Sequence, residues 1–160
     1  MAVRLSEELV EFIESGVSML VGTRDAALRP RVQRAVGAVV APDRESLTVY
    51  LTRQISEETL ANLRDNGLIA LTSSRPYDHR SIQIKGRLLA IRDSVEADRA
   101  HQERYLAGFV EHVYIVGLPR SVMRQLRIFP SVAVTMTAED VFVQTPGPGA
   151  GRRLEAGRSS

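Results

Sequence analysis

The chain has 160 residues, of which 44% are hydrophobic and 25% are charged. This length and composition fit a single globular domain and exclude a disordered or fibrous chain. No apolar run is as long as a membrane-spanning helix, and the acidic start does not resemble a signal peptide, so we expect a cytoplasmic protein. Cysteine is absent and the three histidines lack the spacing of metal ligands, so we expect neither thiolate chemistry nor a metal site.

The charge pattern does not favour nucleic-acid binding. The net charge is only +2, and every basic residue except Lys85 is an arginine. Because arginine stays charged at high pH, the sequence pI of about 9.4 reflects a flat titration curve and not a strongly basic surface. The sequence also lacks a basic stripe with interleaved aromatic residues, so we do not expect a nucleic acid as partner.

Short apolar stretches with turn signals between them recur along the chain. The expected strands are 17–23, 31–41, 46–52, 68–73, 81–92, 131–137 and 140–144, and the expected helices are 5–15, 56–66, 93–113 and 119–128. Because the first three strands have short connections, the sequence predicts a mainly β fold, an antiparallel sheet curled into a barrel with peripheral helices. Ser56 is expected to cap the second helix, and Asp93 with Glu96 to form a capping box for the third.

Arg34 lies in a strand where alternation places it on the same face as Val32, Val36, Ala38 and Val40. A guanidinium on an apolar face needs a partner, because burying an unpaired charge is very costly. Two interpretations remain open: a salt bridge to an acidic residue, or bidentate capture of a phosphate.

A second polar group lies on the strand that begins at Ser81. There Ser81, Gln83 and Lys85 point to one face, while Ile82 and Ile84 point to the other. This polar face is either solvated or binds a planar, anionic ligand.

The start of the helix after Ser56 offers free backbone amides, which attract a phosphate. Glu57 and Glu58 occupy its first turn and oppose an anion there, although Arg53 just upstream partly offsets them. The histidines are less informative, because His79 lies in a turn and His101 and His112 lie on the long helix, where surface positions are common.

The chain divides into a main domain, 1–145, and a Pro/Gly-rich tail, 146–160. The composition of the tail is typical of disorder. However, its prolines lower the entropy lost on docking, and its glycines allow close backbone approach. We therefore expect residues 144–151 to be ordered over a dimer interface near the ligand site, with only the last residues mobile.

The order of these motifs resembles the pyridoxamine 5′-phosphate oxidase-like family of split β-barrels. The resemblance covers roughly residues 5–145 and rests on "VYLT" before a short helix, "LIALTSS", "RSIQIKGRLLAI" and the closing "QTPGPGAG". It implies a split antiparallel barrel that forms a homodimer and binds FMN between its subunits. The implied function is an FMN-dependent oxidoreductase acting on a small molecule.

The resemblance also implies roles for individual residues. Arg34 matches the arginine that grips the FMN phosphate, with Arg53 and Ser56 assisting, whereas Val39, Glu57 and Glu58 stand where the family has basic or phosphate-binding residues. Thr52, Ser81, Gln83 and Lys85 would lie near the flavin ring, and Lys85 would stabilise negative charge on the reduced ring. The alternative is a non-catalytic barrel that stores or senses a flavin or haem, with His79 or His112 as the axial ligand of a haem.

Overall fold

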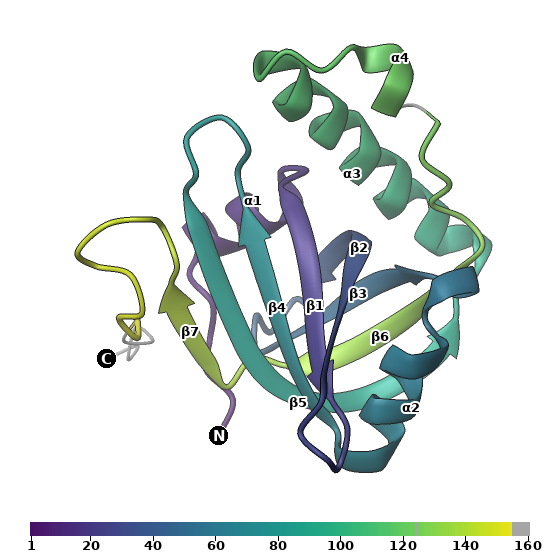
Figure 1. Cartoon of the computed structure of the whole chain (residues 1–160), viewed down its shortest axis with the longest axis vertical. Coiled ribbons are helices and arrows are strands. Elements are labelled where there is room, and N and C mark those ends of the chain that lie inside the picture. The colour runs from purple at the N-terminus through teal and green to yellow at the C-terminus, as the bar shows by residue number, and fades with distance from the viewer. Residues whose placement is uncertain (124, 155–160) are drawn as a thin grey trace.

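The computed structural model describes residues 1–123 and 125–154 and consists of short strands with helices around them (Figure 1). In this part of the chain, the strands are β1 (Ser18–Arg24), β2 (Pro30–Val40), β3 (Ser46–Thr52), β4 (Leu68–Ser74), β5 (Ser81–Asp93), β6 (Ser131–Thr137) and β7 (Asp140–Val143). The helical elements are α1 (Glu7–Glu14), η1 (Arg53–Ile55), α2 (Glu57–Asn66), α3 (Glu96–Ile115) and α4 (Arg120–Met123). All seven expected strands are present with nearly the expected bounds.

The strands form one antiparallel sheet in the order β4-β1-β2-β3-β6-β5-β7, and an additional pairing of β4 with β5 closes six of them into a barrel. The seventh strand, β7, pairs with the outer edge of β5 (Figure 1). This architecture confirms the predicted antiparallel barrel with peripheral helices.

The long strand β5 closes the barrel because it serves two sets of partners. Its first half pairs with β4 and β7, and its second half, from Leu88 to Asp93, pairs with β6. Between the halves, Gly86 lies so close to β6 that a Cβ there would overlap the carbonyl oxygen of Thr137. The strand can therefore pass from its first partners to β6 only where the residue has no Cβ.

A bulge in β2 corrects the expected surroundings of Arg34. The register between β2 and β3 shifts between Ala35 and Ala38, where Gly37 has a φ of 122°. One extra residue inverts the alternation, so Ala38 and Val40 join the barrel interior while Arg34 faces outward and is exposed. The prediction that Arg34 shares a face with Ala38 and Val40 is wrong for this reason.

Most buried side chains fill the barrel and the space under α1 and α3. A smaller cluster of Val36, Tyr50 and Ala133 lies on the other side of the sheet. Beside it, the buried Asp98 of α3 accepts hydrogen bonds from Tyr50 and from both terminal nitrogens of Arg92. This network ties β3 and the end of β5 to the first turn of α3.

The helix ends differ from the predictions. Asp98, and not Asp93, accepts a hydrogen bond from the backbone amide at the start of α3, and Asp93 is the last residue of β5. Ser56 precedes α2, but its hydroxyl donates to the carbonyl of Arg53 instead of capping the helix. The helix α2 ends at Asn66, as expected, and Gly67 follows it in the left-handed conformation.

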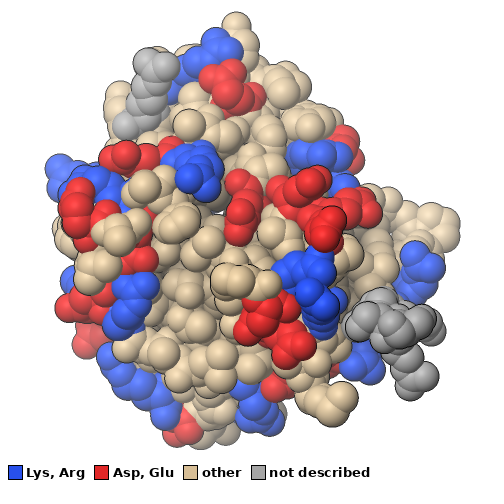
Figure 2. All heavy atoms as spheres, turned by 180° about the vertical axis from the view of Figure 1, so that it is seen from behind, with Lys and Arg blue, Asp and Glu red and all other residues tan. Residues whose placement is uncertain are grey.

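The distribution of charges on the surface agrees with the low net charge, and the character of the helices agrees with the absence of long apolar runs in the sequence. On the face seen in Figure 2, basic and acidic side chains are interspersed over the whole view. Among the described residues, no helix combines the length and the apolar character that crossing a lipid bilayer requires.

Candidate functional site

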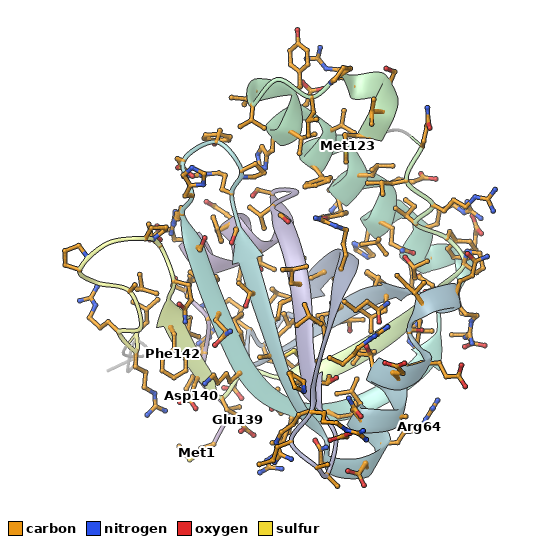
Figure 3. The ribbon with its side chains drawn as sticks, viewed as in Figure 1. Met1, Arg64, Met123, Glu139, Asp140 and Phe142 are labelled. Carbon is orange, nitrogen blue, oxygen red and sulfur yellow. The ribbon has the colours of Figure 1, made fainter. Side chains whose placement is uncertain are left out.

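The outward-pointing side chains of β7, β5, β4, β1 and β2 form a continuous surface, which we call the outer sheet face. The strand register fixes its rows, because neighbouring partners on antiparallel strands point to the same side. One row is Phe142, Gln83, Thr72, Leu20 and Arg34, and the next is Asp140, Lys85, Ala70, Gly22 and Val32. In Figure 3, Phe142 and Asp140 lie on β7, far from Met123 beside α3.

Arg34 stands at the end of the first row and carries an uncompensated charge. Its Nη1 donates to the hydroxyl of Ser18 at 3.2 Å, and its guanidinium lies 5.4 Å from the ring centre of Phe109. Among the described residues, no carboxylate forms an ion pair with it. Burial raises the pKa of Tyr105 to about 12, and Arg34 beside that hydroxyl acts in the opposite direction. Within the described part of the chain, Arg34 is thus available to an anion, and its capture of a phosphate stays a prediction.

The face of β5 that the sequence singled out belongs to the same surface. Gln83 donates from Nε2 to the hydroxyl of Thr72 at 3.0 Å, which leaves its carbonyl oxygen available. Lys85 lies 4.9 Å from the ring centre of Phe142 on the neighbouring strand. Between Gln83 and Arg34 the row contains only Thr72 and Leu20. A flat ligand could therefore contact an amide at one end and a cation at the other.

A cavity of about 470 Å³ adjoins this face at the end nearest α3. Its polar side chains are Ser18, Arg34, Ser74, Arg75, His79, Ser81 and Gln144, and its apolar ones are Pro76, Phe109, Val113, Val116, Leu118, Met123 and Pro146. Arg75 is held by Asp78, to which its Nε donates at 3.0 Å, and this hydrogen bond lowers the pKa of Asp78 to about 2. A molecule in the cavity would meet one paired and one unpaired guanidinium above aromatic and aliphatic walls.

The remaining predicted residues follow β3 and are arranged differently. Ala35 of β2 pairs with Leu51 of β3, and both side chains belong to the barrel core. Arg34 and Thr52, each adjacent to one of these partners, therefore point outward and lie next to each other. Arg53 forms an ion pair with Asp93. Ser56 is only 1% exposed, and its hydroxyl is already used by Arg53. The structure thus brings Arg34, Thr52, Ser81, Gln83 and Lys85 to one face and leaves Arg53 and Ser56 beyond its edge.

Sequence reasoning did not assign the helix and the turn that border the cavity to the site. The sequence places Phe109 and Val113 on an expected helix, 93–113, and gives no role to them or to Arg75. The one available signal was the cluster of charged and aromatic residues in the turn 75–80. Periodicity alone could not place this turn beside α3, since nothing local connects the two.

The tail lies against the barrel as far as the described residues extend. Gln144 and Pro146 line the cavity beside Arg34, and the hydroxyl of Thr145 accepts a hydrogen bond from the amide of Ser81 at 2.9 Å. The chain then turns back and pairs with β7 through Arg152 and Leu154. Residues 144–151 thus lie beside the cavity and β7, whereas their place over a dimer interface stays a prediction, and the last part of the tail, 155–160, lies outside the described residues.

Comparison with known proteins identifies the architecture as a split β-barrel. The structure resembles HupZ from Group A Streptococcus with a TM-score of 0.57 and 16% identity over 92% of this chain and 99% of HupZ. It also resembles a candidate pyridoxamine 5′-phosphate oxidase from Lactobacillus delbrueckii, with a TM-score of 0.56 and 15% identity over 89% and 100% of the two chains. A third similar structure is an FMN-binding protein from Syntrophomonas wolfei, with a TM-score of 0.51 and 14% identity over 84% and 85%.

These likenesses confirm the fold expected from the resemblance: the chain has the split barrel of the pyridoxamine 5′-phosphate oxidase-like proteins. Neither a protein-family model nor a curated protein matches the sequence. The function must therefore be argued from the residues of this chain.

Proposed function

We propose that this protein binds FMN on the outer sheet face, at a homodimer interface, and acts as an oxidoreductase of a small molecule in the cytoplasm. The observation that carries the proposal is the uncompensated charge of Arg34 at one end of a flat row that has the Gln83 amide near its other end. When bound, FMN would supply the electron transfer that no side chain can perform.

The residues present fit such a ligand. Arg34 would hold the phosphate, because its guanidinium has five donors and pairs with no carboxylate of the residues that the structure describes. Gly22 and Ala70 keep the middle of the face low, so a planar ring could lie close to the strands. Gln83 would contact the polar edge of the ring, and Lys85 would stabilise negative charge there.

The phosphate end is weaker than the resemblance implies. Arg53 and Arg31 are the nearest alternatives, but they are paired with Asp93 and Glu58, respectively. Ser56 is buried and would have to give up its bond to Arg53 before it could assist. Arg34 would therefore supply most of the charge that neutralises the phosphate.

The substrate would enter the 470 Å³ cavity next to Arg34. This volume lies within the usual range for small-molecule sites. The paired Arg75 and the ring of Phe109 favour a small molecule with a planar apolar part and a negative or strongly polar group.

A haem-binding module is the second candidate, and the position of His79 favours it over a general ligand-binding role. His79 lines the cavity beside Arg34. In contrast, the ring of His112 packs against Tyr77 at 5.4 Å between ring centres, and burial lowers its pKa. His79 is thus the histidine that could serve as an axial ligand in this cavity.

The absorption spectrum of the purified protein distinguishes these proposals. A band in the blue, together with quenching of flavin fluorescence on titration with FMN, would support the flavin proposal. A Soret band that is lost in His79→Ala would support haem instead. A colourless protein that quenches no flavin fluorescence at high micromolar concentration would contradict both.

A further inference from the structure

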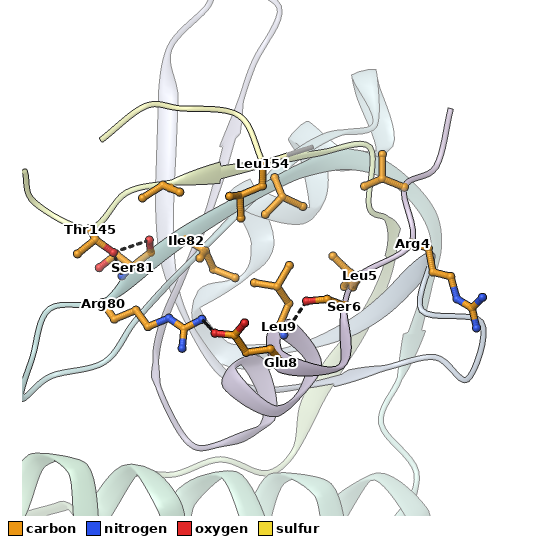
Figure 4. Close-up of a pocket in the computed structure, with 13 residues that line it drawn as sticks. Arg4, Leu5, Ser6, Glu8, Leu9, Arg80, Ser81, Ile82, Thr145 and Leu154 are labelled. Carbon is orange, nitrogen blue, oxygen red and sulfur yellow. Dashed lines mark hydrogen bonds and ion pairs between the residues drawn. The ribbon is translucent and has the colours of Figure 1, made fainter. Parts of the chain in front are cut away.

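A second cavity, of about 380 Å³, lies on the opposite side of β5 and β7 from the outer sheet face (Figure 4). Ile82, Val141 and Val143 line it, and they alternate along their strands with Gln83 and Phe142, which belong to the outer sheet face. The other walls are the segment before α1, the start of α1 and the returning tail. The two cavities share Ser81, and none of the other residues that line the second cavity belongs to the proposed flavin site.

The walls of this second cavity are mainly apolar. Leu5, Ile82 and Val141 are buried members of the main core, and Leu9 and Leu154 are partly buried against it. Leu154 comes from the tail, where its amide donates to the carbonyl of Val141 at 2.7 Å. In Figure 4 the side chains of Leu9, Ile82 and Leu154 point toward one another across the cavity. The space therefore suits an apolar chain.

One guanidinium stands at the edge of this apolar space. Nη2 of Arg80 donates to Oε1 of Glu8 at 2.6 Å, and the guanidinium lies 4.7 Å from the ring centre of Phe12. The Glu8 side chain is 73% exposed, whereas that of Arg80 is 31% exposed. Exposed ion pairs contribute little stability, so another carboxylate could replace Glu8 at small cost. Arg4, the other basic residue of the lining, points away from the cavity in Figure 4.

The hydroxyl groups around the cavity are already engaged. Ser6 accepts from the amide of Leu9 at 3.3 Å, Thr145 accepts from the amide of Ser81 at 2.9 Å, and Ser81 donates to Ser74 at 2.8 Å. A ligand would thus find its charged partner at Arg80 and apolar contacts elsewhere.

We propose that this cavity is a second ligand site, which binds a small carboxylate with an unbranched apolar chain. The chain lies between Leu9, Ile82 and Leu154, and the carboxylate takes the place of Glu8 on Arg80. The site is independent of FMN, so it can be tested whether or not the flavin proposal holds.

The test is calorimetric titration of the full-length protein with octanoate. NMR shifts of methyl groups then locate the bound octanoate. We expect saturable binding and shifts of the Leu9 and Leu154 methyl groups. Glu8→Gln removes the competing carboxylate and should strengthen binding about two- to fivefold. The matched control is Glu7→Gln, because Glu7 pairs with Arg44 and does not line the cavity. This control should bind octanoate like the wild type.

A second variant tests the charge itself. Arg80→Gln should weaken octanoate binding about tenfold or more, while octanol binding should change little. Arg34→Gln, on the outer sheet face, should leave octanoate binding unchanged. Absence of binding at millimolar octanoate, equal affinities of Glu8→Gln and Glu7→Gln, or loss of binding in Arg34→Gln would each overturn the proposal.

Discussion

At the scale of single residues, Arg34 should account for most of the affinity for FMN. A charge-assisted hydrogen bond contributes roughly 1.5–3 kcal/mol, so Arg34→Gln should weaken FMN binding by about ten- to a hundredfold in a fluorescence titration. The control is Arg29→Gln, which removes the same charge from an exposed turn where Arg29 pairs with Asp25. If both variants bind FMN equally well, the phosphate is not held by Arg34.

Asp98 should make the stability of the fold depend on acid. The hydrogen bonds from Arg92, followed by those from the Val95 amide and Tyr50, hold the pKa of Asp98 far below its ordinary value, although burial acts in the opposite direction. A group with a lowered pKa stabilises the folded state above its unfolded-state pKa, and this stabilisation is lost as the pH falls toward the folded-state pKa. The unfolded-state pKa is about 3.9, so the loss should begin as the pH falls below about 5.

Asp98→Asn tests this dependence. The variant leaves Arg92 without its carboxylate and should lower the free energy of unfolding by about 1–3 kcal/mol at pH 7. The difference from the wild type should shrink as the pH falls from 5 to 3, measured by urea unfolding at each pH. Asp65→Asn is the charge-matched control, because Asp65 is exposed on α2. A difference that stays constant over this range would contradict the assignment.

At the scale of elements, the passage of β5 from its first partners, β4 and β7, to β6 depends on Gly86. Gly86→Ala should lower the free energy of unfolding by about 1–3 kcal/mol, because the added Cβ forces the backbone of β5 away from Thr137. Gly22→Ala provides the comparison, since the nearest atom to a Cβ there, the carbonyl oxygen of Ala70, is 3.9 Å away. Urea unfolding of the two variants should differ clearly, and equal stabilities would show that β5 adapts freely.

The strands could be predicted because alternation is a local signal, whereas the irregularities could not. The bulge at Gly37 places Arg34 on the outside and Ala38 inside, yet nothing in the sequence marks the extra residue except one glycine. Asp98 accepts the Val95 amide at the start of α3, and Arg92 and Tyr50 reach its carboxylate from other elements, whereas a search for capping residues along the sequence selects Asp93. Local patterns thus predict where strands lie, but not how contacts between residues far apart in the sequence place bulges and helix ends.

The candidate site was predictable only in part for the same reason. Gln83 and Lys85 are on one strand, so their shared face follows from alternation alone. Their position in the same surface as Arg34 depends on the register of β5 with β4, β4 with β1, and β1 with β2. The resemblance supplied the residues, but the lack of an ion pair for Arg34 among the described residues and the pairing of Arg53 with Asp93 required the folded chain.

At the scale of the whole molecule, the outer sheet face leaves apolar side chains in water. Val32 is 60% exposed and Leu20 is 40% exposed, and they lie beside Gly22 and Ala70. Such a low, partly apolar surface is typical of an interface, and a second copy of the chain would cover it. The proposed homodimer would also enclose a flavin that otherwise lies on an open sheet.

Val32→Glu should therefore convert the proposed dimer to a monomer. A dimer interface around Val32 would have to bury the new carboxylate of each subunit without a partner. The free energy that this burial costs is far larger than the free energy that a contact at the edge of the interface contributes. Sedimentation velocity at about 10 µM should show the wild type as a dimer and Val32→Glu as a monomer that unfolds at nearly the same urea concentration.

The control is Leu89→Glu, because Leu89 is 57% exposed but lies in the half of β5 beyond Gly86. A monomeric wild type, or a Val32→Glu variant that still sediments as a dimer, would mean that this face is not the interface. Any FMN bound there would then be held by a single subunit.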